Sequence, residues 1–265
     1  MSGMQLEGRT ALITGAARGI GRVTARLLAD AGADVGLVDV DPGVEEAAAD
    51  IRKPGRRAAS ATLDIADPAA VGAGVAKLRE ALGEIDVLVS NAGIVNHIAP
   101  LTRMTHEGWE RELAVNLTGA FNLIQALLPP MIERRFGRII VISSGAARGG
   151  LHHQAAYAAS KAGLIGLAQT VSLEQARHGI TCNVILPGLI ETEMVRAMPA
   201  ELRDAAVART PAHRLGRMEE VGQLIAFLVS DAASFINGAE IDIDGGMRLN
   251  TGSLGSRREV RGAES

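Results

Sequence analysis

The chain has 265 residues, of which 47% are apolar and 22% charged, and its formal net charge is -3. This composition is ordinary for a globular protein, and the slight acidity argues against a nucleic-acid-binding surface, which would carry a basic stripe. We find no apolar run of the roughly 18 residues that a membrane span needs and no secretory signal. Cys182 is the only cysteine, which excludes an internal disulfide, so we expect a cytoplasmic protein.

Apolar strand-like runs alternate with longer helical patterns along the chain, which is typical of a parallel sheet covered on both faces. We therefore predict an α/β fold, a doubly wound Rossmann-type three-layer sandwich with a mainly parallel seven-stranded sheet. The expected strands lie at residues 10–14, 34–39, 57–63, 85–90, 138–143, 181–186 and 240–243. Helices are expected at residues 19–31, 42–53, 106–134, 154–177 and 219–230, with another beginning after Asp67.

The domain organisation follows from the same pattern. No linker interrupts the alternation, so residues 1–249 are expected to form a single Rossmann-type domain. Residues 250–265 are rich in Gly, Ser, Arg and Glu and contain few apolar side chains. That composition predicts a flexible C-terminal tail.

A glycine-rich loop, Thr14–Gly21, follows the first expected strand and opens the first expected helix. Glycines in such a loop permit a tight turn, a close approach to a pyrophosphate and close helix–strand packing, and the helix N-terminus supplies free N–H groups for an anion. The Gly-Lys-Ser/Thr ending of an ATP-binding P-loop is missing, which disfavours a kinase or ATPase. A dinucleotide is therefore expected on five residues: Gly15, Arg18, Gly19, Ile20 and Gly21.

Asp39 ends the second expected strand, where a ribose-binding acid is expected. Its carboxylate can accept hydrogen bonds from both ribose hydroxyls and would repel a 2′-phosphate, so it favours NAD over NADP. Arg18 opposes this prediction because a guanidinium can pair with a 2′-phosphate. An alternative is that Asp39 is only a strand-end turn residue, since Asp41-Pro42 follows it. We give the charge repulsion from Asp39 more weight.

Further polar and small residues follow the third and fourth expected strands. In an open α/β sheet, ligands lie outside the carboxyl ends of the strands. Asp64 could accept a hydrogen bond from an adenine amino group, and small residues would let the backbone lie against a cofactor. Each of these residues could instead be a cap or turn residue. The expected contacts at this edge are Asp64, Ile65, Asn91, Ala92 and Gly93.

Tyr157 is the only tyrosine in the chain, and Lys161 follows it at i+4. On a helix this spacing places both side chains on one face. A phenol is a poor base at neutral pH, but a nearby ammonium lowers its pKa and suits it to acid/base catalysis. Taken alone, such a pair is more often an ordinary helix face.

The remaining motifs give the pair its context. Asn116 lies in an expected helix, Ser144 ends the fifth expected strand thirteen residues before Tyr157, and Pro187-Gly188-Leu189-Ile190-Glu191-Thr192 follows the sixth. With T-G-x-x-x-G-x-G, N-A-G, Y-x-x-x-K and P-G-x-x-x-T in this order, the chain resembles the short-chain dehydrogenase/reductase family from about Leu6 to Gly246. Ser90, where a second Asn is common before N-A-G, is the one departure that we note.

The resemblance implies a role for each of these residues. Tyr157 would be the general acid/base, and Lys161 would bind the nicotinamide ribose and lower the Tyr157 pKa. Ser144 would hold the substrate oxygen, and Asn116 would support a water-linked proton path through Lys161. Thr192 and the backbone of Ile190 would fix the nicotinamide carboxamide, and Pro187 and Gly188 of the same segment would also bind the cofactor.

Together with Asp39, the resemblance implies an NAD-dependent oxidoreductase that interconverts a secondary alcohol and a ketone of small size. The resemblance also implies a homotetramer. One alternative is an NADPH-dependent 3-oxoacyl-thioester reductase, which Asp39 disfavours because such reductases usually use NADPH. Another is a non-catalytic nucleotide sensor or scaffold, which the four catalytic-type residues disfavour. No metal is expected, since His152-His153 has no carboxylate at ligand spacing. The substrate and direction stay open.

Overall fold

The computed structural model describes residues 5–249, so the predicted tail at 250–265 lies outside the described residues. Its sheet has seven strands in the order β3-β2-β1-β4-β5-β6-β7, and every pairing is parallel. This confirms the predicted sheet. The chain order reverses between β1 and β4, which places a ligand crevice at their carboxyl ends. The strands are β1 Thr10–Thr14, β2 Asp34–Asp39, β3 Ala58–Thr62, β4 Val87–Ser90, β5 Gly137–Ile142, β6 Ile180–Pro187 and β7 Glu240–Ile243.

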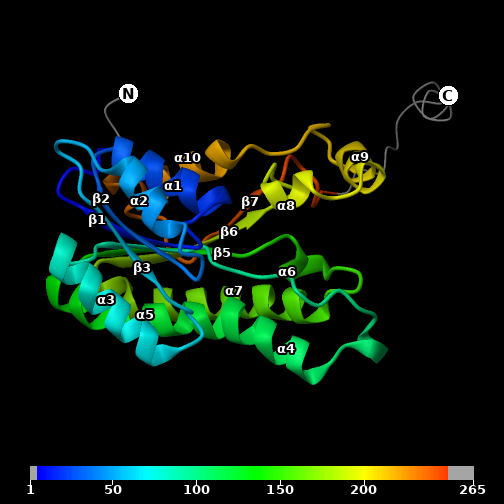
Figure 1. Ribbon diagram of the computed structural model, residues 1–265, viewed down its shortest axis with the longest axis horizontal. Helices are drawn as coiled ribbons and strands as arrows, with labels where there is room; N and C mark the ends of the chain where they lie inside the picture. Colours follow the sequence, from blue (N-terminus) through cyan, green and yellow to red (C-terminus); the bar gives the residue numbers. More distant parts are fainter. Residues whose placement is uncertain (1–4, 250–265) are drawn as a thin grey trace.

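Helices cover both faces of the sheet (Figure 1). One layer contains α1 Gly19–Asp30, α2 Val44–Ile51 and α10 Met218–Val229. The other layer contains α3 Pro68–Leu82, α4 His106–Leu113, α5 Gly119–Arg134 and α7 Ala155–Gln175. The predicted three-layer arrangement is thereby confirmed.

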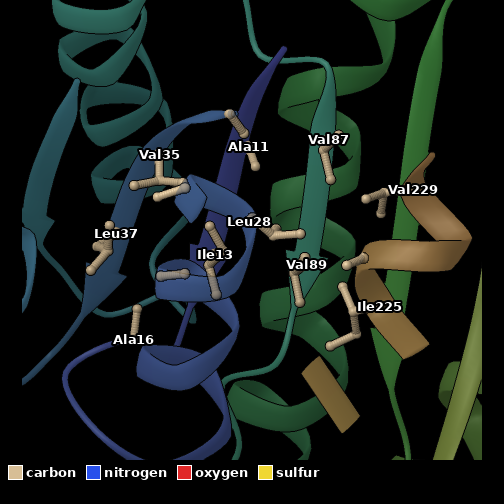
Figure 2. Packing of buried hydrophobic residues seen from close by; sticks show 14 of the residues in the cluster. Ala11, Ile13, Ala16, Leu28, Val35, Leu37, Val87, Val89, Ile225 and Val229 are labelled. Carbon is tan, nitrogen blue, oxygen red and sulfur yellow. The ribbon is translucent and has the colours of Figure 1, made fainter. Parts of the chain in front are cut away.

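The core consists of two apolar clusters, one on each face of the sheet. Successive side chains of a strand point to opposite faces, so Ile13 belongs to one cluster and its neighbour Leu12 to the other. Figure 2 shows the first cluster, in which Leu28 of α1 and Ile225 of α10 lie over the strands that carry Ile13 and Val89. Because β1 is buried on both sides, the loop that follows it starts from a rigid base.

The predicted helix at residues 106–134 is interrupted. A π-helical turn, Ala114–Thr118 (η2), separates α4 from α5. The combined stretch His106–Arg134 is long and apolar enough to cross a membrane, although we predicted no such segment from the sequence. Half of its most apolar window is buried inside the protein, as in a core helix. Such π-turns are frequent at functional sites, and this one carries Asn116.

Short elements gather beyond the carboxyl ends of β5 and β6. These are α6 Ala146–Gly149, α8 Glu193–Arg196 and α9 Ala200–Arg209, which lie together at the right of Figure 1. Three 3-10 turns complete the described chain: η1 Leu101–Arg103, η3 Ala176–His178 and η4 Asp231–Ala233. The short helices and loops therefore collect at the edge where a ligand is expected.

Candidate active site

The glycine loop after β1 has the geometry of a phosphate cradle. Gly15 and Gly19 have φ of 64° and 60°, a left-handed conformation that side chains resist. A Cβ on Gly21 would lie 2.1 Å from the Gly15 carbonyl oxygen, so only glycine fits there. Arg18 precedes α1 as its N-cap and provides no side-chain cap, which leaves the first-turn N–H groups accessible to an anion. The loop fits the pyrophosphate of a dinucleotide.

Asn91 ties the glycine loop to the N-A-G segment. Its Nδ2 donates to the Thr14 carbonyl at 2.9 Å, and the Ala92 N–H donates to Thr14 Oγ1 at 3.0 Å. A Cβ on Gly15 would lie 2.9 Å from Ala92 Cα, so the two loops are in contact. Sequence reasoning placed Asn91 against the cofactor, whereas its amide here holds the two loops together.

The Asp39 carboxylate is fixed by backbone donors. Oδ2 accepts from the Ala17 N–H at 3.0 Å and Oδ1 from the Asp41 N–H at 3.1 Å. Each oxygen keeps a second acceptor position for a ribose hydroxyl. Arg18 lies 3.7 Å from Asp41 in an ion pair. The cation that could attract a 2′-phosphate therefore already has an acidic partner.

Asp64 and Ile65, which follow β3, both form hydrogen bonds with other parts of the protein. Asp64 Oδ2 accepts from Arg111 at 2.7 Å and Oδ1 from the Ala66 N–H at 2.9 Å. Burial raises the pKa of Asp64, but these hydrogen bonds outweigh it and hold the pKa below its ordinary value. Ile65 is buried in the core, and its carbonyl accepts from Asn122 at 2.9 Å. The expected adenine contact at Asp64 thus competes with Arg111.

Lys161 lies in the interior at the end of β5. Its side chain is buried, and Nζ donates to the Ile142 carbonyl at 2.8 Å. The Ser143 hydroxyl donates to the Lys161 carbonyl at 2.8 Å and fixes α7 on the strand. A Cβ on Gly93 would lie 3.2 Å from Lys161 Nζ and 3.3 Å from Asn116 Oδ1. The structure therefore brings Gly93, Asn116 and Lys161 together.

Tyr157 is half-buried on the same helix, with Lys161 Nζ 5.7 Å from its ring centroid. Burial raises the pKa of Tyr157, the hydrogen bond with Ser144 lowers it, and the negative charge of Glu112 raises it further. The net pKa lies above its ordinary value. This corrects the expectation that Lys161 depresses it, because burial dominates here and the ammonium is directed to Ile142.

Asn116 joins three parts of the site. Its Nδ2 donates to the Ile94 carbonyl at 3.0 Å and to Ser160 Oγ at 3.1 Å, and its Oδ1 accepts from the Ile94 N–H at 2.7 Å. Ser160 in turn donates to the Tyr157 carbonyl at 2.7 Å. Asn116 thus links the loop after β4 to the helix of Tyr157 and Lys161.

The segment after β6 is placed by packing and by one cap. A Cβ on Gly188 would lie 2.8 Å from Asp244 Cα, and the Gly188 N–H donates to the Ile243 carbonyl at 3.1 Å. Pro187 ends β6, and Ile190 is buried. Thr192 caps α8, accepting from the Val195 N–H at 3.4 Å. The segment lies at the carboxyl end of the sheet, as expected for the nicotinamide side.

Three polar residues of this region were not predicted from the sequence as functional residues. Ser143 and Ser160 are buried and connect α7 to β5 and to Asn116. Glu112, one turn before Asn116, is buried with only 1% of its surface exposed. Its i+4 spacing from Asn116 is the signal that could have indicated a shared inward face.

The histidine pair has a structural position. The rings of His152 and His153 are exposed and stack with centroids 3.8 Å apart, and the His153 carbonyl accepts from the Ala99 N–H at 2.9 Å. Across residues 5–249, no group of three or more His, Cys, Asp or Glu is placed to hold a metal ion.

The buried Lys161 predicts a gain in stability when its charge is removed. Burial lowers the pKa of Lys161 to about 8, a shift that corresponds to about 3 kcal/mol of unfavourable burial below that pH. In Lys161→Met, the lost hydrogen bond to Ile142 offsets part of this cost, so the free energy of unfolding at pH 7 should rise by about 1 to 2 kcal/mol, as measured by thermal unfolding. The variant should have no activity. As pH rises above 8, Lys161 loses its proton in the folded wild type before it does in the unfolded chain. The difference in unfolding free energy between variant and wild type should therefore narrow above pH 8. A difference that stays constant would contradict the buried charge at Lys161.

Known proteins share this arrangement. A family model described as enoyl-(acyl carrier protein) reductase matches residues 15–248. The 3-oxoacyl-(acyl-carrier-protein) reductase of Escherichia coli is 41% identical over 93% of this chain and 100% of its own length. The cis-4-hydroxycyclohexanecarboxylate dehydrogenase of Sinomonas cyclohexanicum is 40% identical over 90% of this chain and 96% of its own.

Among solved structures, levodione reductase superposes with a TM-score of 0.89 at 33% identity, covering 93% of this chain and 100% of that one. The family match spans both the glycine loop and the Tyr157–Lys161 helix. The chain therefore belongs to the short-chain dehydrogenase/reductase family and is an oxidoreductase of the CH–OH or keto group.

Proposed function

We propose that the protein is an NAD-dependent enzyme that interconverts a secondary alcohol and a ketone. The observation that carries this proposal is the acidic ribose end of the crevice. Asp39 is held in place by two backbone N–H groups, and the nearby Arg18 is paired with Asp41 at 3.7 Å. A 2′-phosphate would meet the carboxylate of Asp39, and Arg18, which is shared with Asp41, would offset only part of that repulsion.

A bound nicotinamide would supply or accept the hydride. Tyr157 would give its hydroxyl proton to the substrate oxygen during reduction and take it back during oxidation, while the hydroxyl of Ser144 would hold that oxygen. Lys161 would bind the ribose hydroxyls and Asn116 would orient its surroundings. A phenol is protonated at neutral pH, and burial moves the pKa of Tyr157 further upward, so the hydroxyl is in the form that ketone reduction requires.

The test is to measure kcat/KM of the purified enzyme for NADH and NADPH with a panel of cyclic and open-chain ketones. We expect NADH to be preferred by about 100-fold, which corresponds to about 3 kcal/mol of charge repulsion. Fluorescence titration of both cofactors gives the same comparison without a substrate. A clear preference for NADPH in both measurements would overturn the cofactor proposal.

A second candidate is reduction of a 3-oxoacyl thioester. It is supported by the 40–42% identity to reductases of that name from Escherichia coli, Thermotoga maritima and Mycobacterium avium. An acetoacetyl thioester should be included in the substrate panel with each cofactor. If it exceeds every simple ketone in kcat/KM with NADPH, this second function replaces the first.

We further propose a cytoplasmic homotetramer. Support for association comes from large apolar side chains exposed on the outer helices, among them Phe121 of α5 and Leu173 of α7, which is 85% exposed. Subunit contacts would remove such side chains from water. Light scattering on the purified protein tests the mass of the assembly.

A further inference from the structure

The loop after β4 is held by two side chains from one stretch of helix. Asn116 exchanges two hydrogen bonds with the backbone of Ile94. One turn earlier, Glu112 Oε1 accepts from the Asn96 N–H at 2.7 Å and from the His97 N–H at 2.9 Å. Three of the first four residues after N-A-G, Ile94, Asn96 and His97, are therefore held by α4 and the π-turn.

The same loop then contacts α4 and the loop between Ser144 and Tyr157. His97 Nε2 accepts from the Thr105 N–H at 3.2 Å, and a Cβ on Gly108 would lie 2.7 Å from the His97 ring, so the ring packs directly on α4. The Ala99 N–H donates to the His153 carbonyl in the loop between Ser144 and Tyr157. Holding Asn96 and His97 therefore constrains both the loop after β4 and the loop that joins Ser144 to Tyr157.

A carboxylate is an unusual choice for this buried place. Glu112 is only 1% exposed, and within residues 5–249 its Oε2 has no hydrogen-bond partner. Burying such a group is unfavourable unless it is paired, and an apolar side chain of similar volume is often as stable or more stable. α4 packs against α7, and the charge is close enough to act on Tyr157. Stability alone does not account for Glu112.

We propose that Glu112 is a positioning residue of the active site, whose Oε1 holds the Asn96–His97 turn and thereby sets the substrate-facing loop 94–101 relative to Tyr157. This inference rests on the proposed function for its kinetic readout. Its hydrogen-bond partners are the backbone N–H groups of Asn96 and His97. Neither residue is among the expected cofactor contacts, so the effect should fall on the ketone more than on NADH.

The test compares Glu112→Leu, Glu112→Gln and the control Glu110→Gln, which changes an exposed carboxylate on the same helix. Glu112→Leu removes the acceptor, so KM for the ketone should rise at least tenfold while Kd for NADH stays within about twofold. Glu112→Gln keeps an acceptor oxygen and should restore KM to within about threefold. Glu110→Gln should match the wild type.

Hydrogen exchange separates this inference from the proposed function. The amides of Asn96 and His97 should exchange at least tenfold faster in Glu112→Leu and close to the wild-type rate in Glu112→Gln, whether or not a ketone is turned over. If these amides exchange at the wild-type rate in Glu112→Leu, the positioning role is wrong. An equal rise in Kd for NADH and in KM for the ketone would also overturn it, because that pattern indicates a general structural role. Failure of wild-type turnover alone refutes only the proposed function.

Discussion

Replacing Tyr157 by phenylalanine is expected to lower kcat by about 10³- to 10⁴-fold while leaving NADH affinity nearly unchanged. The change removes only the hydroxyl that would exchange a proton with the substrate oxygen. The ring stays on α7 beside Lys161, whose Nζ already donates to Ile142. Stopped-flow measurement of NADH oxidation, with fluorescence titration of the cofactor on the same preparation, checks both parts.

Ser144 provides the companion variant for this prediction. Apart from the hydrogen bond with Tyr157, Ser144→Ala removes only a local one, from the Ala146 N–H at 3.2 Å, so the variant should fold. Because the Ser144 hydroxyl would hold the substrate oxygen without transferring the proton, kcat should fall by about 10²-fold, less than in Tyr157→Phe. If Tyr157→Phe keeps more than a tenth of the wild-type kcat, the proton must come from another group. The assigned chemistry would then be wrong even if the cofactor prediction holds.

Replacing Asp39 by serine is expected to shift the ratio of kcat/KM for NADH over NADPH by about 100-fold toward NADPH. The substitution removes the charge that would repel a 2′-phosphate. Serine retains a small acceptor for the Ala17 N–H, which Asp39 holds at 3.0 Å, so the glycine loop should keep its shape. Steady-state kinetics with both cofactors at fixed ketone concentration measures the shift.

Two further aspartates refine this experiment. Asp41→Ser would release Arg18 from its ion pair and should move the ratio in the same direction, by a smaller factor because the pair is largely exposed. Asp50→Ser removes a carboxylate that pairs with Arg22 on the surface and should leave the ratio unchanged. A similar shift in all three variants would mean that overall charge, not Asp39, controls the preference.

Regular patterns made the sheet and its main helices predictable. Runs such as Thr10–Thr14 are buried on both faces, so an unbroken apolar stretch indicated a central parallel strand. The glycine loop was predictable because positive φ at Gly15 and contact at Gly21 demand that residue type. The π-turn at Ala114–Thr118 was missed, because inserting one residue per turn leaves the apolar pattern nearly helical.

The sequence indicated which residues lie near one another at this edge of the sheet, but not which partners their side chains contact. Placement at the carboxyl ends of strands indicated the neighbourhood of Asp64 and Asn91, but not that Arg111 and Thr14 would occupy their polar atoms. The pKa of Tyr157 depends on burial, which spacing along a helix does not reveal. Glu112 was missed because its spacing from Asn116 indicates only a shared helix face, while its partners, the N–H groups of Asn96 and His97, leave no mark in the sequence.

The tight contact among Gly93, Lys161 and Asn116 has a consequence for how this enzyme could acquire new substrates. A methyl group added at Gly93 would lie 3.2 Å from Lys161 Nζ and 3.3 Å from Asn116 Oδ1, so any larger residue there would have to displace one of these two side chains. Exposed apolar side chains on the loops and short helices outside the sheet have room to change. Examples are Ile98, Leu151 and Met194. A library that randomises these exposed positions while leaving Gly93 intact should therefore alter the substrate range and keep Lys161 and Asn116 in place.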